Sequence, residues 1–148
     1  MHRIHLNIGS NRGDRRAIIG RAVALLAKQF PGARLLLSDY VESAPWGYES
    51  PNPFLNRGVL MLTPEDPLDP LQVLDRTQRV EALGGGADNA HRDADGNYTD
   101  RRLDIDIIDM DSLHLDTPRL QLPHPRMHLR SFVLQPLHQL NTLYPPEG

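Results

Sequence analysis

The 148-residue chain contains no cysteine, so it forms no disulfide and cannot use a thiol as a nucleophile or zinc ligand. It has no apolar run long enough to span a bilayer, and we expect no signal sequence, because Met1-His2-Arg3 leads directly into a short predicted strand. Its formal charge of −3 at pH 7 argues against a broad basic surface for nucleic acid. We therefore expect a cytoplasmic protein that acts on small molecules, with neither a membrane nor nucleic acid as partner.

Several motifs of familiar chemistry are also missing. Gly84-Gly85-Gly86 lacks the lysine and the following helix of a P-loop. There is no G-x-S-x-G motif, and the seven histidines show neither H-x-H nor H-E-x-x-H spacing, which argues against a serine hydrolase and a zinc site. If the chain binds ATP, it does so without a P-loop.

Hydrophobic periodicity predicts one domain over residues 1–148. Strands are expected at residues 4–8, 35–42, 57–63 and 101–108, with a short strand around 113–118, and helices at 15–29, 69–83 and 132–140. The order β-α-β-β-α-β matches a ferredoxin-like α+β sandwich, an antiparallel sheet with helices packed on one face.

The most informative pattern is the alternation Leu103-Asp104-Ile105-Asp106-Ile107. Successive side chains of a strand point to opposite faces, so both aspartates share one face, about 7 Å apart, and the aliphatic side chains face the core. Two carboxylates on a rigid strand suit a hard cation such as Mg²⁺, and Arg101 just before them suits phosphate charge. The pattern leaves a solvated strand face open as the alternative.

Two further segments fit a ligand site, and each also has a structural interpretation. Gly9-Ser10-Asn11 follows a predicted strand and precedes a helix, where it either approaches a phosphate or forms only a turn and cap. Trp46 and Phe54 lie close in sequence to Asn56. An aromatic ring beside an amide suits the binding of a flat heterocycle, although such rings can also simply fill space in the hydrophobic core.

Polar residues of the second half leave similar alternatives. Gln78 and Glu81 share one face of the predicted second helix, which is also the pattern of solvated helix surface. His124 and Arg130 lie between a proline-rich segment and the last helix, where they either contact phosphates or remain on the surface.

Read together, these segments resemble the 6-hydroxymethyl-7,8-dihydropterin pyrophosphokinase family of folate biosynthesis, in the family's order and at close to its spacing. The matching segments are Asn7-Ile8-Gly9-Ser10-Asn11-Arg12-Gly13-Asp14, Ser43-Ala44-Pro45-Trp46-Gly47, Phe54-Leu55-Asn56, Gln78-Arg79-Val80-Glu81, Arg101-Arg102-Leu103-Asp104-Ile105-Asp106, Leu122-Pro123-His124 and Arg130-Ser131-Phe132-Val133-Leu134-Gln135-Pro136-Leu137.

The resemblance implies an ATP-dependent diphosphotransferase, in which the pterin hydroxymethyl oxygen attacks the β-phosphorus of ATP and AMP leaves. Two Mg²⁺ ions held by Asp104 and Asp106 would bridge the ATP phosphates, while Phe54 and Phe132 would enclose the pterin ring. The implied pterin site is Ser43, Trp46, Phe54, Asn56 and Phe132, and the implied ATP site is Gln78, Glu81, Arg101, Ile107, Arg119, Gln121, His124 and Arg130. ATP and the pterin are the expected partners of a monomer.

Segment 84–100 departs from the family pattern, because it offers no clear counterpart of the family's pair of loop arginines. Arg92 is the expected catalytic substitute beside Arg101, Asp104 and Asp106, and Tyr98 stands for the family's loop tryptophan. The segment is either a lid that closes over the substrates or a surface insertion without a catalytic role. The resemblance also implies a cis peptide bond at Leu122-Pro123.

Two other functions stay open on the sequence alone. A binding protein that keeps the pocket but has lost the loop arginines is one, although the presence of Arg101, Asp104, Asp106, His124 and Arg130 favours the enzyme. The other is a magnesium-dependent nuclease or polymerase-like palm, which the acidic balance and the lack of a basic stripe disfavour.

Overall fold

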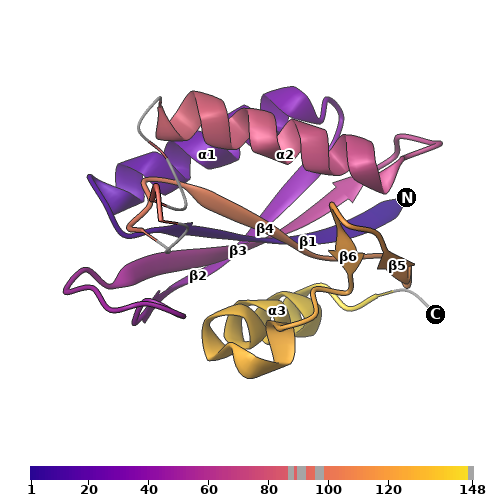
Figure 1. The fold of residues 1–148 in the computed structure, drawn as a ribbon. Coiled ribbons are helices and arrows are strands. Elements are labelled where there is room, and N and C mark those ends of the chain that lie inside the picture. The colour runs from indigo at the N-terminus through magenta and orange to yellow at the C-terminus, as the bar shows by residue number, and fades with distance from the viewer. Residues whose placement is uncertain (87–88, 90–92, 96–98, 147–148) are drawn as a thin grey trace.

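The computed structural model describes residues 1–86, 89, 93–95 and 99–146. A four-stranded antiparallel sheet of order β2-β3-β1-β4 forms its centre (Figure 1). Its strands are β1 (His2–Ser10), β2 (Arg34–Ser43), β3 (Phe54–Thr63) and β4 (Asp104–Met110), and a separate two-stranded sheet pairs β5 (Leu115–Asp116) with β6 (Gln121–Leu122). The helices are α1 (Arg15–Gln29), α2 (Pro70–Gly85), the 3₁₀ turn η1 (Met127–Leu129) and α3 (Ser131–Leu143).

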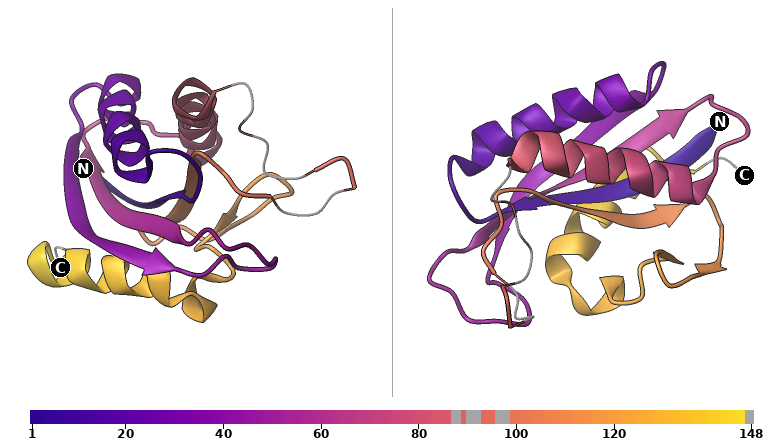
Figure 2. Two further views of the ribbon diagram at one scale, coloured as in Figure 1. Left: turned by 90° about the vertical axis from the view of Figure 1, so that its left-hand side faces the viewer. Right: turned by 45° about the horizontal axis from the view of Figure 1, so that its top comes forward.

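The predicted α+β order and antiparallel sheet are confirmed, and the expected bounds of α1 are exact. β6 was not predicted, and the strand expected from residue 101 begins only at Asp104. Helices α1 and α2 share one face of the sheet as expected, whereas α3 covers the opposite face (Figures 1 and 2). No described helix is both long and apolar enough to cross a membrane.

Helices cover both faces because the central strands are apolar on both sides. On β1, Ile4, Leu6 and Ile8 are fully or almost fully buried and belong to the larger core, together with residues of α1 and α2. On the other side Leu60 of β3 packs in a second cluster with Leu140 of α3. Leaving this second face in water would expose apolar surface worth about 25 cal/mol per Å², so α3 has a strong reason to dock there.

A glycine allows α3 to come close to the sheet. A Cβ atom built on Gly58 of β3 would lie 2.6 Å from Cβ of Pro136, which real structures do not tolerate. The Gly58 N–H also donates to Oγ of Ser38 on the edge strand β2, at 2.8 Å. The space left by the missing side chain therefore determines how near α3 lies to β3, and with it the position of the helix start beside the sheet.

Both long helices begin at aspartates. Asp14 accepts a hydrogen bond from Ala17 N at the start of α1, and Asp69 accepts one from Leu71 N at the start of α2. Each carboxylate satisfies a backbone donor that has no partner inside the helix. The predicted cis bond at Leu122-Pro123 is confirmed.

Candidate functional site

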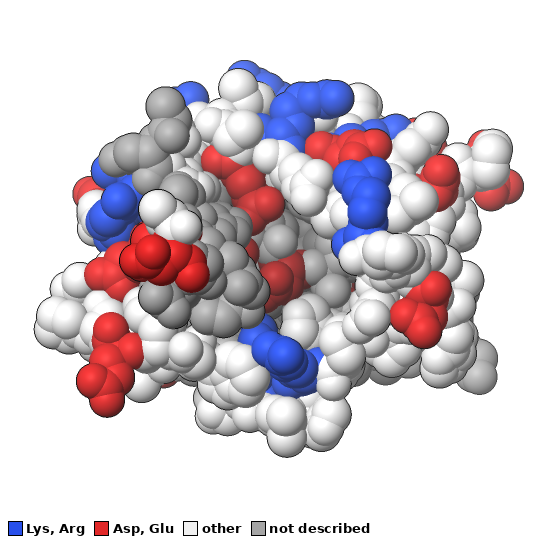
Figure 3. All heavy atoms as spheres, in the orientation of Figure 1, with Lys and Arg blue, Asp and Glu red and all other residues white. Residues whose placement is uncertain are grey.

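A cavity of about 430 Å³ opens where the ends of β1, β3 and β4 meet the start of α3. Its lining comes from all three strands, from three connections and from the start of α3: Asn7, Gly9, Ala44, Trp46, Tyr48, Phe54, Asn56, Arg101, Asp104, Asp106, His124, Pro125, Arg126, Arg130 and Phe132. The face seen in Figure 3 is hollowed near its centre, with acidic atoms inside and basic side chains around the rim. The cavity therefore combines carboxylates, cations and aromatic rings.

Strand register builds the floor of this cavity. Gly9 of β1 lies opposite Asn56 on one side and opposite Asp104 on the other. A Cβ atom on Gly9 would lie 3.2 Å from Oδ1 of Asn56 and 3.3 Å from the Phe54 ring. The absence of a side chain at this position keeps the space beside the Asn56 amide and the Phe54 ring, both of which line the cavity, free of a methyl group.

Asp104 has its charge partly neutralised by the arginine predicted beside it. Nη1 of Arg101 lies 2.7 Å from Oδ2 of Asp104, and both side chains are mostly buried, with 12% and 18% exposed. Asn11 holds the Arg101 backbone: Arg101 N donates to Oδ1 of Asn11 at 2.7 Å, and Asn11 N donates to the Arg101 carbonyl at 3.0 Å. The position of Arg101 is therefore determined before any ligand binds.

Asp106 and Glu81 are the carboxyl groups with the most strongly altered acidity. Burial and then the charge of Asp104 raise the pKa of Asp106 to about 7, against the lowering effect of Arg130 and Arg101. Burial and then Asp104 also raise the pKa of Glu81 to about 8. Both groups therefore bind a proton more readily than an exposed carboxyl group does, and strongly altered pKa values of this kind are typical of functional sites.

The amide of Asn56 has a defined orientation. Its Nδ2 donates to the Val41 carbonyl at 3.0 Å and to Oγ of Ser43 at 2.8 Å. A carbonyl can only accept, which assigns the nitrogen to this side and directs Oδ1 toward Gly9 and the cavity. Ser43, which does not line the cavity itself, thus supports the residue that does.

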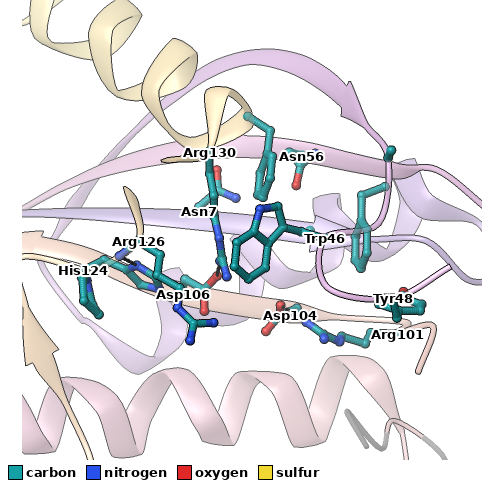
Figure 4. Close-up of a pocket in the computed structure, with 15 residues that line it drawn as sticks. Asn7, Trp46, Tyr48, Asn56, Arg101, Asp104, Asp106, His124, Arg126 and Arg130 are labelled. Carbon is teal, nitrogen blue, oxygen red and sulfur yellow. Dashed lines mark hydrogen bonds and ion pairs between the residues drawn. The ribbon is translucent and has the colours of Figure 1, made fainter. Parts of the chain in front are cut away.

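The aromatic and cationic side chains are interleaved around the cavity (Figure 4). The guanidinium carbon of Arg101 lies 5.8 Å from the centre of the Phe54 ring, and that of Arg130 lies 5.8 Å from the Phe132 ring. Arg130 also lies 4.5 Å from the Trp46 ring. Flat surfaces and fixed positive charges are therefore available within the same space.

His124 presents a neutral imidazole. Burial, followed by the charges of Arg130 and Arg126, lowers its pKa, so it is uncharged at neutral pH. Its Nδ1 accepts a hydrogen bond from Arg126 N at 3.2 Å, which leaves the other ring nitrogen as the N–H donor. His124 N donates to the Ile108 carbonyl at 2.7 Å, which fixes the residue beside β4.

The structure brings most of the predicted site residues to this cavity and leaves others outside its lining. Those in the lining are Trp46, Phe54, Asn56, Arg101, Asp104, Asp106, His124, Arg130 and Phe132. Those outside it are Ser43, Gln78, Glu81, Ile107, Arg119 and Gln121. Arg92 and Tyr98 lie outside the described residues, so the structure says nothing of the loop prediction.

The residues outside the lining have identifiable positions. Arg119 donates to Asp75 of α2 at 2.7 Å and lies 3.4 Å from Oε1 of Gln78. Nε2 of Gln121 donates a hydrogen bond to Oδ1 of Asp116 at 3.3 Å, across the small β5-β6 sheet. Ile107 is 5% exposed and belongs to the main core, so a ligand would meet its backbone rather than its side chain.

The residue that organises the site was named by the sequence only as part of the undecided segment Gly9-Ser10-Asn11, and it was not among the predicted site residues. Asn11, 3% exposed, donates through Nδ2 to Tyr48 Oη, to the Asn52 carbonyl and to Oδ1 of Asp100. It thereby joins the end of β1 to two connections that are about 40 and 90 residues away in the chain. Asn7, which is 5% exposed and lies opposite Asp106, was missed too, although a polar residue within an apolar strand was a usable signal.

The donor set fits a hard cation. Within the described part of the chain, no three His, Cys, Asp or Glu side chains form a group that could hold a metal ion. Asp104 and Asp106 instead offer carboxylate oxygens on one face of β4, at the edge of a cavity with room for further oxygen ligands. One or two carboxylates completed by phosphate oxygens and water is the usual environment of Mg²⁺ in proteins.

Known proteins similar to this chain are pterin pyrophosphokinases. The model of the 7,8-dihydro-6-hydroxymethylpterin-pyrophosphokinase (HPPK) family matches residues 5–142. A 2-amino-4-hydroxy-6-hydroxymethyldihydropteridine pyrophosphokinase of Porphyromonas gingivalis is 39% identical over 147 residues, covering 98% of this chain and 95% of that protein. Proteins of the same name from Bacillus subtilis and Pseudomonas aeruginosa are each 35% identical, over 136 and 141 residues, which cover 92% and 95% of this chain and 76% and 81% of those proteins.

Proposed function

The chain belongs to the 7,8-dihydro-6-hydroxymethylpterin-pyrophosphokinase family, and we propose that the cavity containing Asp104 and Asp106 is its active site. The enzyme transfers pyrophosphate from ATP to the hydroxymethyl group of 6-hydroxymethyl-7,8-dihydropterin, giving the pterin diphosphate and AMP in folate biosynthesis. The observation that carries the assignment of the site is that one cavity joins two carboxylates with three arginines, four aromatic rings and the oriented amide of Asn56.

The pterin binds at the end of the cavity formed by Phe54, Asn56 and Phe132. The faces of the two phenylalanine rings provide dispersion contacts to a flat heterocycle. Oδ1 of Asn56 accepts from a ring N–H, since its Nδ2 is committed to Val41 and Ser43. Trp46 contributes through the backbone of its connection.

ATP binds at the other end, with its phosphates between Asp106, Arg130 and His124. Asp104 and Asp106 would hold Mg²⁺, two ions in our proposal, and the metal would supply charge neutralisation for the ATP phosphates. The nucleotide contacts that the resemblance implies for Gln78, Glu81, Ile107, Arg119 and Gln121 form part of the same proposal, although these residues lie outside the cavity lining.

Transfer then depends on position and charge rather than on a side-chain nucleophile. The attacking atom is the pterin hydroxymethyl oxygen, and AMP departs as the leaving group. Arg101 and Arg130 offset charge on the transferred group, and the neutral His124 donates a hydrogen bond without adding positive charge. Asn11 keeps Arg101 in place, so little reorganisation is needed during reaction. We further propose that residues 1–148 act as one domain and as a monomer.

The test is formation of AMP that requires the pterin. Wild-type protein is incubated with ATP, Mg²⁺ and 6-hydroxymethyl-7,8-dihydropterin, and AMP and the pterin diphosphate are measured together. We expect the two products in equal amounts, and loss of both with Asp106→Asn. Tight binding of both substrates without AMP formation would instead identify a binding protein. Full activity of Asp106→Asn would show that this cavity is not the active site.

A further inference from the structure

The side chain of Trp46 connects two parts of the site that are distant in sequence. Trp46 lies in the connection between β2 and β3, whereas Arg126 and Arg130 flank η1 before α3. The guanidinium carbons of Arg130 and Arg126 lie 4.5 Å and 5.2 Å from the centre of the indole ring. Figure 4 shows the indole among Arg130, Asp106 and Asp104 rather than turned away from them.

The two arginines beside the aspartates are held in different ways. Arg101 donates through Nη1 to Asp104 at 2.7 Å, so a carboxylate fixes its guanidinium. Nη1 of Arg130 lies 3.8 Å from Oδ2 of Asp106, beyond hydrogen-bond distance. The buried Nε of Arg130 has no hydrogen-bond partner among the described residues. The Arg130 guanidinium instead lies over two ring faces, with its carbon 4.5 Å from the centre of the Trp46 ring and 5.8 Å from that of Phe132.

Contact with a ring face has a consequence that an ion pair lacks. A guanidinium carries its five N–H donors in its own plane, so an aromatic face can hold it without using any of them. Donors held in this way remain available for the planar, two-point contact that phosphate oxygens favour. An arginine paired with a carboxylate must instead share or break those bonds when the phosphate arrives.

We propose that Trp46 is a positioning residue that holds Arg130, and with it Arg126, ready for the nucleotide phosphates. This rests on the proposed active site and adds a role for the indole beyond the pterin pocket. Trp46 does not belong to either apolar core cluster, and 38% of it is exposed, so burial in the core does not explain its position.

The first experiment compares nucleotide binding by calorimetry, using Mg²⁺ with the α,β-methylene analogue of ATP and, separately, AMP. Trp46→Leu should weaken binding of the analogue about threefold to tenfold while changing AMP binding less than about twofold, because the arginines act on the additional phosphates. Trp46→Phe, which restores a ring face, should recover part of the loss. Equal weakening for both nucleotides, or no weakening, overturns the proposal.

A matched control exists outside the cavity. Tyr40 is enclosed by Arg16 and Arg57, whose guanidinium carbons lie 4.5 Å and 4.4 Å from its ring centre. Tyr40→Leu removes a similar arginine–ring–arginine contact without touching the cavity lining, so nucleotide binding should stay within about twofold of wild type. A loss as large as that of Trp46→Leu would show a general effect on the fold and overturn the proposal.

A double-mutant cycle tests whether Trp46 acts through Arg130. Arg130→Ala should weaken binding of the analogue strongly, and adding Trp46→Leu to it should cause little further loss. If the fold-loss in affinity of the double variant equals the product of the two single losses, so that the cycle is additive in free energy, then the indole acts independently of Arg130, contrary to the proposal. The pterin-dependent AMP assay on wild-type protein keeps this result separate from the reaction itself, because an active enzyme with an additive cycle refutes only the role of Trp46.

Discussion

The carboxylate of Glu81 accepts a hydrogen bond from the backbone N–H of Ile105, with 3.1 Å between Oε2 and N. β4 is an edge strand, and Ile105 lies between the two aspartates that we assign to the metal. A side chain of α2 therefore satisfies a backbone donor that the sheet leaves unpaired. The same contact connects α2 to the part of β4 that carries Asp104 and Asp106.

Removing this acceptor should destabilise the protein. We expect Glu81→Ala to lower the free energy of unfolding by about 1–3 kcal/mol, the cost of leaving a buried N–H without a partner. Glu81→Gln keeps an acceptor, and the raised pKa of about 8 means that Glu81 is mostly uncharged at pH 7 without metal, so this variant should stay close to wild type. Urea unfolding of metal-free protein measures both, and equal losses would contradict the role of the hydrogen bond.

The metal assignment predicts a separation of activity from stability. Asp104→Asn and Asp106→Asn should each lower turnover roughly a hundredfold or more, because a carboxamide is a poor ligand for a hard dication. Asp109→Asn changes the same chemical group on the same strand, outside the cavity lining, and should retain turnover. Steady-state assays at saturating Mg²⁺ and ATP provide the comparison. Near-normal turnover in the first two variants would be incompatible with metal binding at these residues.

The two aspartates also show what a sequence can reveal. The alternation of Asp104, Ile105 and Asp106 is local, and the strand period alone predicts that the carboxylates share a face. The strand order that places them beside Gly9 and Asn56 depends on pairing between residues far apart in the chain. Here the resemblance to a family supplied what local patterns could not.

Asn11 illustrates the opposite case. Its partners Asp100 and Arg101 are about 90 residues away, and nothing in the local turn sequence distinguishes a hub from an ordinary turn. The prediction that all helices lie on one face of the sheet was wrong for α3 for a similar reason. Leu60 and Val59 are both fully buried, but their sequence does not say that different helices cover the two faces.

The hydrogen bonds to Asp100 predict a pH dependence of stability. Burial by itself would raise the pKa of Asp100, but donors from Asn52, Ser50, Tyr48 and Asn11 together lower it below 3.8. A depressed pKa in the folded state stabilises the protein above the unfolded value, and this contribution disappears as the pH falls through the folded value. The Tm of wild-type protein should therefore be higher than that of Asp100→Asn at pH 7, and the difference between the two Tm values should shrink below about pH 4. Thermal unfolding from pH 7 to pH 3 tests this, and a constant difference would contradict it.

The last prediction concerns the narrow space beside Gly9. The backbone of Gly9 is extended and suits any residue, so the constraint is the space between Asn56 and Phe54. The methyl group of Gly9→Ala would push against the Asn56 amide and the Phe54 ring, both of which we assign to the pterin. We expect roughly tenfold weaker pterin binding, equivalent to about 1.4 kcal/mol, with smaller changes in ATP binding.

Gly20 provides the matched control, because an added Cβ there meets nothing within 4 Å. It lies exposed within α1, so Gly20→Ala should leave pterin binding unchanged and stabilise the protein by about 0.5–1 kcal/mol through better helix propensity. Calorimetric titration with 6-hydroxymethyl-7,8-dihydropterin, in the presence of Mg²⁺ and the ATP analogue, compares the two variants directly. If Gly9→Ala binds the pterin as tightly as Gly20→Ala does, then the ligand does not occupy the space between Asn56 and Phe54, and the pterin end of the cavity has been assigned incorrectly.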